Sequence, residues 1–153
     1  MPNRFKRWFP NLVPCFSKGQ HEFPPGVSSE DIGSSEKELC IIFPESLRRF
    51  IMLTNGGKLF NGWIEFFTIE NFVSKNRVAR GNWFGSNDLF FAESNVYDCG
   101  SDYSFMKLGT DKEPPVMAFS ADPSFVCEAA LNFSNWLGLL CKQGGRAIPN
   151  DRL

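Results

Sequence analysis

The stretch FPESLRRFIMLTNGG, residues 43–57, decides the fold because it predicts an amphipathic helix that stops at two glycines. Pro44 suits a first helical position, and Glu45 lies in the first turn, where the helix dipole favours an acid. Four residues at the spacing i, i+3, i+4 and i+7 predict one buried face: Leu47, Phe50, Ile51 and Thr54. The Asn-Gly-Gly at 55–57 tolerates positive φ, so we expect a left-handed cap to end the helix.

A second helix is predicted immediately before this stretch, in SSEDIGSSEKELC, residues 28–40. Ser28 can cap its N-terminus, with Asp31 three residues later as an acidic variant of the capping box. Ile32 and Leu39 are seven residues apart and therefore share one face. The two predicted helices follow each other directly, so both precede the first predicted strand.

Aromatic and β-branched residues follow the glycines and predict a group of strands separated by turns. The first candidate lies within KLFNGWIEFFTI. The next is DLFFAES. The third, DYSFMKLG, alternates, with Tyr103 and Phe105 on one face and Ser104 and Met106 on the other. The fourth is PPVMAFS, whose prolines stand outside the strand, where a missing N–H does little harm.

Two further segments have helical character. IENFVSKNRVARG, residues 69–81, is ambiguous and is interpreted as a possible short helix, and the GNWFGSN that overlaps its end reads as a loop carrying rings. DPSFVCEAALNFSNWLGLL, residues 122–140, predicts a final helix through apolar spacings of 4, 3, 4 and 3. The residues with that spacing are Val126, Ala130, Phe133, Leu137 and Leu140.

The order of these elements favours one α+β domain with helices packed around a largely antiparallel β-sheet, since the strands are grouped and the helices lie outside the group. We expect three regions: a basic, aromatic, Pro-rich N-terminal arm at 1–27, the folded domain at 28–141, and an irregular C-terminal tail at 142–153. The arm contains too many apolar residues for a solvated tail, so it should pack on the body or on a partner.

Charge is unevenly distributed along the 153 residues, although the net charge is only −1. Residues 1–20 carry four basic residues and no acid, whereas residues 88–141 carry eight acids against two lysines, a net charge of −6. The acidic half is either an ordinary solvated surface or a face that meets a basic partner. The basic aromatic RFKRWF of the arm could touch nucleic acid or a membrane surface, but four charges are a weak footprint. We expect neither nucleic-acid binding nor membrane insertion.

The chain lacks the sequence patterns of common catalytic and cofactor sites, including G-x-S-x-G, the P-loop, G-x-G-x-x-G and H-E-x-x-H. A Cys–His or Ser–His mechanism would need His21, the single histidine, which lies in the arm. The five cysteines include no C-x-x-C pair, so a metal site is not expected, and reduced cytosolic thiols are the simplest interpretation. We therefore predict a protein that is not an enzyme and has no cofactor.

The segment FPESLRRFIMLTNGG resembles the start of the SUKH superfamily, in which a proline, an acidic or polar pair and a Leu/Phe-rich helix precede Asn-Gly-Gly. LFFAES, YSFMKLG and PPVMAFS resemble its strands, and FSNWL resembles its closing helix. The resemblance covers roughly residues 28–141. The arm is longer than the family core needs, and residues 72–87 contain no family landmark.

The resemblance implies a non-enzymatic α+β protein that acts through protein partners. Many bacterial members are immunity proteins that neutralise a cognate toxin by direct binding, so we expect a cytoplasmic immunity protein, an antitoxin of bacterial competition, that occludes a toxin domain. The alternative is an interaction scaffold or regulator of the kind that controls fungal cell-wall assembly. The resemblance supplies a structural motif and no catalytic residue: Pro44, Asn55, Gly56 and Gly57.

Rings and acids expected on loops are the candidate partner contacts, because Trp and Tyr anchor interfaces and a rim of charge sets the association rate. The opposing interpretation of the two rings in GNWFGSN is that they belong to the core. No small-molecule substrate is expected. The candidate contacts are Trp83, Phe84, Glu93, Tyr97, Asp98 and Asp102.

Overall fold

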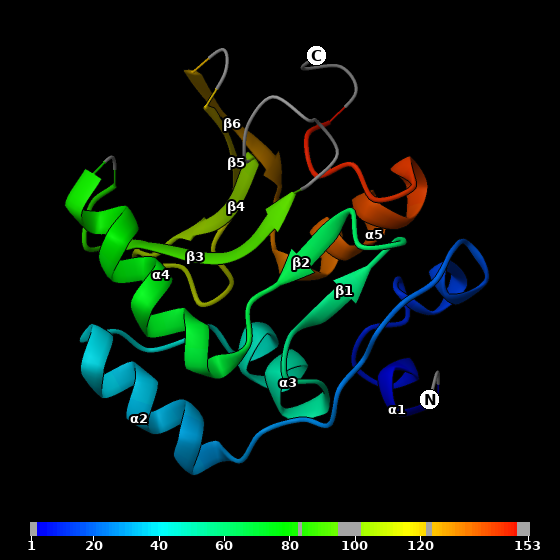
Figure 1. Ribbon diagram of the computed structural model, residues 1–153, viewed down its shortest axis with the longest axis horizontal. Coiled ribbons are helices and arrows are strands. Elements are labelled where there is room, and N and C mark those ends of the chain that lie inside the picture. The colour runs from blue at the N-terminus through cyan, green and yellow to red at the C-terminus, as the bar shows by residue number, and fades with distance from the viewer. Residues whose placement is uncertain (1–2, 83, 95–101, 122–123, 150–153) are drawn as a thin grey trace.

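The computed structural model describes residues 3–82, 84–94, 102–121 and 124–149 (Figure 1). Within them the helices are α1 (Asn3–Lys6), the 3-10 helix η1 (Val13–Ser17), α2 (Ser29–Leu39), α3 (Glu45–Leu53), α4 (Ile69–Asn82) and α5 (Phe133–Gln143). The strands are β1 (Gly57–Leu59), β2 (Ile64–Phe66), β3 (Asp88–Ser94), β4 (Asp102–Lys107), β5 (Val116–Ala121) and β6 (Ser124–Ala130).

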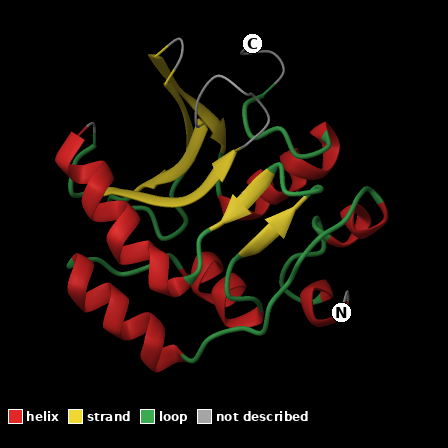
Figure 2. Cartoon of the chain, in the orientation of Figure 1, coloured by secondary structure: helices red, strands yellow, loops and turns green. Residues whose placement is uncertain are grey.

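The six strands form one antiparallel sheet in the order β1-β2-β3-β4-β5-β6, so each strand pairs with its neighbours in sequence. The helices lie outside this meander (Figure 2). The predicted α+β class with an antiparallel sheet is therefore confirmed. A bulge in β3, between Phe90 and Ala92, shifts the register to β4. The bulge affects which side chains of β3 share a face.

One face of the sheet is covered by α3 and α5 and forms the aromatic core. Phe66 of β2 lies 4.6 Å from Phe50 of α3, measured between ring centroids. Phe91 of β3 lies 4.9 Å from Trp136 of α5. Phe133 of α5 contacts Phe50, Phe66 and Phe91, so it joins the two helices to the sheet. The predicted buried face of α3 is present, since all four of its predicted positions are fully buried.

The arm contributes to this same core. Phe5, Phe9 and Leu12 are at most 1% exposed, and the ring of Phe9 contacts Phe133 in α5 at 5.9 Å. Residues 20–22 also run along the outer edge of β1, where the Glu22 N–H donates to the Lys58 carbonyl at 2.7 Å. Burial of these side chains on folding is the reason that a Pro-rich segment keeps a fixed path.

A disulfide joins the arm to α5 and corrects the expectation of reduced thiols. Cys15 and Cys141 are bonded, with their Cα atoms 5.2 Å apart across 126 residues of sequence. Cys40 and Cys127 are outside this bond. The sequence offered no local pairing signal, because the two half-cystines meet only after the arm has packed on the last helix.

Three local predictions differ from the structure. Residues 124–130 form strand β6, not the start of a helix, because they pair with β5 through Phe119 opposite Val126 and its neighbours. Residues 69–82 form the 14-residue helix α4, which is longer than expected. The cap of α3 is Thr54 in an extended conformation, and positive φ begins only at Gly56. Asn55 therefore does not provide a left-handed cap, because its backbone N–H bonds to Pro25 and holds the chain extended.

Candidate functional site

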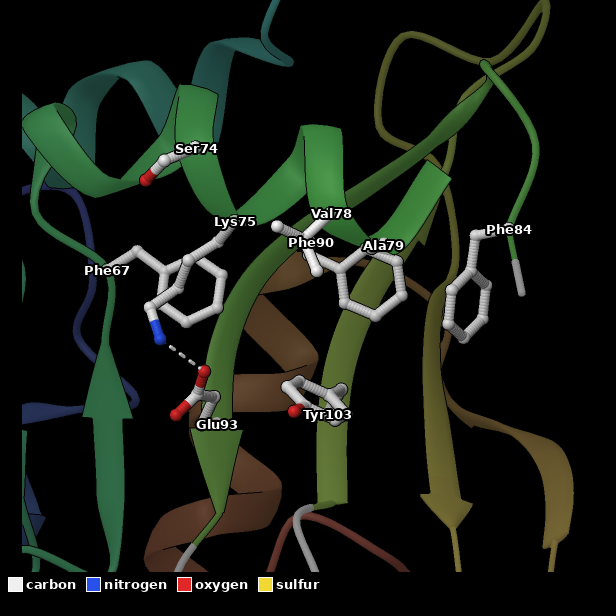
Figure 3. Close-up of a pocket in the computed structure, with 9 residues that line it drawn as sticks. All are labelled: Phe67, Ser74, Lys75, Val78, Ala79, Phe84, Phe90, Glu93 and Tyr103. Carbon is white, nitrogen blue, oxygen red and sulfur yellow. Dashed lines mark hydrogen bonds and ion pairs between the residues drawn. The ribbon is translucent and has the colours of Figure 1, made fainter. Parts of the chain in front are cut away.

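A pocket opens between α4 and the face of the sheet opposite α5 (Figure 3). Its volume is about 250 Å³, and its wall is mainly rings and aliphatic side chains with one ion pair. The rings of Phe84 and Phe90 lie 4.3 Å apart, and Phe90 lies 5.8 Å from Tyr103. The nine lining residues are Phe67, Ser74, Lys75, Val78, Ala79, Phe84, Phe90, Glu93 and Tyr103.

The ion pair at one end of the pocket joins helix to sheet. Lys75 Nζ lies 2.6 Å from Glu93 Oε1, and the side chains are 40% and 19% exposed. The same ammonium lies 5.2 Å from the centroid of the Phe67 ring, within the range of a cation–π contact. Partial burial strengthens such a pair relative to a fully solvated one. The pocket therefore has an apolar floor and a charged, half-exposed rim.

Asn76 fixes α4 against the bulge of β3 and thereby sets the shape of the pocket. Its Oδ1 accepts the backbone N–H of Phe90 at 2.8 Å, and its Nδ2 donates to the carbonyls of Phe90 at 3.0 Å and Phe72 at 2.8 Å. The side chain is fully buried. A buried amide with both ends bonded holds two elements in one register, because leaving either end unpaired is costly.

The predicted contact residues divide into three groups. Phe84 and Glu93 both line the pocket, although Glu93 lies in β3 and not in a loop. Asp102 begins β4 and is only 7% exposed, so its expected place on an exposed loop is wrong. Burial raises the pKa of Asp102 above its ordinary value, and a hydrogen bond with the Ser120 side chain opposes that shift. Trp83, Tyr97 and Asp98 lie outside the described residues.

Phe84 packs on the sheet and is also partly open to solvent. Its ring is half-buried and packs on Phe90, Phe105 and Phe119, with centroid distances of 4.3, 5.2 and 5.1 Å. It also forms part of the open wall of the pocket. A ring in this position stabilises the sheet face and remains accessible to a partner.

The Asn-Gly-Gly motif contacts three other segments of the chain: the arm, the end of β2 and the start of α4. Asn55 Oδ1 accepts the N–H of Ile69 at 2.7 Å, and its Nδ2 donates to the Glu70 carboxylate at 3.2 Å. The backbone N–H of Glu70 and the Asn55 amide hold the pKa of Glu70 below its ordinary value. Asn55 therefore caps the N-terminus of α4, although it lies 14 residues earlier in the sequence.

The two glycines allow backbones to approach closely. A Cβ at Gly56 would lie 2.5 Å from the Phe66 carbonyl oxygen, and one at Gly57 would overlap the Glu22 carbonyl oxygen. Both residues have positive φ, at 70° and 128°. Pro44 is the residue before α3, at its N-cap, one position earlier than expected. These contacts are between backbone segments and helix ends, and Gly56 also lies against the backbone of the pocket residue Phe67.

Both ring nitrogens of His21 form hydrogen bonds with backbone groups. Its Nδ1 accepts the Phe60 N–H at 3.1 Å, which leaves Nε2 as the donor to the Cys15 carbonyl at 2.9 Å. In the described part of the chain, no three His, Cys, Asp or Glu side chains gather to hold a metal ion. His21 thus connects the arm to the hairpin of β1 and β2.

Several pocket residues were not among the predicted contacts, including Phe67, Lys75, Val78 and Tyr103. The alternation of DYSFMKLG indicated that Tyr103 and Phe105 share a face, which the structure confirms through their pairing with Glu93 and Phe90 of β3. The pocket residues of α4 could not be predicted in this way, because the period of a helix does not show which face of a sheet the helix packs on.

The chain is thus an α+β domain with an apolar pocket between a helix and a sheet face. The sequence profile of the SMI1 / KNR4 family (SUKH-1) matches residues 26–138, and the chain belongs to this family. Members of the family are generally non-enzymatic binding proteins. No curated protein matches the chain. Among the described residues, no helix has the length and apolar content needed to cross a bilayer.

Proposed function

We propose that this protein is an immunity protein that binds a cognate toxin domain and neutralises it by direct occlusion, with the pocket beneath α4 as the centre of the interface. The supporting observation is the combination of an apolar floor and a charged rim in one half-open site. Interfaces have this anatomy, with a desolvated apolar centre surrounded by polar groups.

The size of the pocket favours a protein partner over a metabolite. Its volume is about 250 Å³, below the range of about 300–1,000 Å³ for small-molecule sites. A space of this size suits one or two side chains of a partner. Val78 adds an exposed apolar rim, since its side chain is 65% exposed. We therefore expect Phe84, Glu93 and Val78 to contact the toxin.

Trp83, Tyr97 and Asp98 remain candidate contacts. Trp83 directly precedes Phe84 in sequence, and Tyr97 and Asp98 follow the end of β3 by a few residues. Asp102 is a weaker candidate because it is buried. Neutralisation inside the producing cell would place the protein in the cytoplasm, where a disulfide such as Cys15–Cys141 is uncommon, so fractionation of that cell with thiol labelling would test the location and the bond together.

The test is co-expression with the products of neighbouring genes, scored by complex formation and by rescue of growth. A one-to-one complex with a toxin domain that also restores growth would support the proposal. Several weaker partners without rescue would overturn it in favour of the scaffold or regulator of the cell-wall-assembly type. Turnover of a substrate without any partner would overturn both.

A matched pair of substitutions locates the interface. Val78→Asp places a charge on the rim of the pocket, whereas Ile42→Asp places the same charge on an apolar side chain that is 80% exposed in the link between α2 and α3. We expect Val78→Asp to weaken the complex at least about tenfold and Ile42→Asp to leave it unchanged. Equal effects would show that the pocket is not the docking site.

A further inference from the structure

The strand registers place six side chains in one row across the whole sheet, on the face that carries the pocket. Each member is the direct cross-strand partner of the next. Side chains opposite one another in adjacent strands share a face, so the row crosses from β1 to β6 beside α4. The row consists of Lys58, Glu65, Glu93, Tyr103, Phe119 and Val126.

The row has a charged end and an apolar end. Glu65 lies directly opposite Glu93, an arrangement of like charges that is destabilising by itself. Lys75 pairs with Glu93, whereas no ion pair of Glu65 is present among the described residues, although Lys58 is its neighbour in the row. At the other end Val126 is 50% exposed. The row therefore offers a carboxylate to a cation and an apolar surface to an apolar side chain.

The spacing of the row distinguishes between the shapes of an occupant. Adjacent strands lie about 4.8 Å apart, so the row is about 24 Å long. Side chains on one face of an α-helix repeat about every 5.4 Å, whereas those on one face of an extended chain repeat about every 6.6 Å. Over five intervals the mismatch is about 3 Å for a helix and about 9 Å for an extended chain. A helix of about 16 residues spans the row.

We propose that this row receives an amphipathic helix of the partner protein, laid across the strands beside α4. A basic residue of that helix pairs with Glu65, and apolar residues spaced by three or four positions contact Tyr103, Phe84 and Val126. Phe84 takes the place of Phe119 in this contact, because the side chain of Phe119 is only 6% exposed and lies against the Phe84 ring. The inference rests on the proposed function for the partner being a protein, and it adds the shape and chemistry of the segment that docks.

The test uses a phage library of random 16-residue peptides, selected against the full chain. We expect enriched peptides to show apolar residues at i, i+3, i+4 and i+7 with Arg or Lys toward one end. A proline placed in the middle of a selected peptide should abolish binding, since it breaks a helix. Enrichment of alternating, extended sequences, or no enrichment at all, would overturn the inference.

Variants of the row give the second readout. We expect Glu65→Lys and Val126→Asp each to weaken binding of a selected peptide at least about tenfold. Matched controls are Asp111→Lys, an exposed acid outside the row, and Leu131→Asp, an apolar side chain that is 70% exposed. The controls should change the affinity less than about twofold, and circular dichroism should show all four variants folded. Equal loss in the controls would overturn the inference.

The outcomes separate this inference from the proposed function. A toxin complex that depends on Val78 but not on Glu65 or Val126 would keep the immunity function and reject the docked helix. Helical peptides that bind the row without any toxin complex would keep the docked helix and reject immunity.

Discussion

Asn76→Ala is expected to lower the free energy of unfolding by about 4 kcal/mol. The substitution removes three hydrogen bonds and leaves the N–H and carbonyl of Phe90 without the partner that Asn76 provides. Each buried polar group left unpaired costs about 1–3 kcal/mol, so the two groups together cost about 2–6 kcal/mol. Domains of this kind are stable by about 5–15 kcal/mol, so the loss is a large fraction of the total.

Urea unfolding followed by circular dichroism measures this loss, and Asn82→Ala is the matched control. Asn82 lies in the same helix and is exposed, with one side-chain bond to the Val78 carbonyl at 2.9 Å. Its substitution should change stability by no more than about 0.5 kcal/mol. A loss below about 1 kcal/mol for Asn76→Ala, or equal losses for both variants, would refute the role given to Asn76 in joining α4 to β3.

Three further outcomes follow from the same structure. Reducing the Cys15–Cys141 disulfide should lower the free energy of unfolding by up to about 5 kcal/mol, because the unfolded chain regains the entropy of a loop spanning 126 residues. Urea unfolding with and without reductant measures this loss, and equal stability in the two conditions would contradict a formed bond. Burial raises the pKa of Asp102, so ionising this carboxyl costs more free energy in the folded state than in the unfolded state. The resulting loss of stability is absent at low pH and grows as pH rises through the ordinary carboxyl range. Asp102→Asn should therefore gain stability over the natural chain as pH increases, and parallel pH profiles of unfolding would contradict this. Gly57→Ala should lower the free energy of unfolding by about 2–4 kcal/mol, because the new Cβ would overlap the Glu22 carbonyl. The control Gly33→Ala, on the open face of α2, should raise it by up to about 1 kcal/mol. Equal thermal midpoints for the two variants would count against the close approach at Gly57.

Elements with a strong local period could be predicted from the sequence, and elements fixed by distant pairing could not. Ser28 does cap α2, since its hydroxyl accepts the Asp31 N–H at 3.2 Å, and strand β3 has the predicted bounds. Residues 124–130 were wrongly predicted as helical because Val126 and Ala130 have the spacing that continues the period of α5. Their pairing with β5 overrides that local preference, as tertiary context often does.

The site was less predictable than the fold because its parts come from separate elements. Phe90 and Glu93 are three positions apart in β3, so strict alternation would put them on opposite faces. The bulge at Phe90/Ala92 brings both to the pocket face, where they pair with Phe105 and Tyr103. A bulge of this kind has no sequence signature in DLFFAES, and α4 is held above it by contacts that are distant in sequence, among them the buried amide of Asn76 and the ion pair of Lys75 with Glu93.

The bond between the arm and the last helix has a consequence for synthesis of the chain. A ribosome releases Cys15 well before Cys141, so the aromatic arm emerges more than a hundred residues ahead of α5, which it covers in the native state. Until then Phe9 lacks the Phe133 ring on which it packs. Contacts between distant parts of a sequence form slowly, and exposed rings favour aggregation. A nascent chain of this protein should therefore need chaperone protection until its final helix has been made.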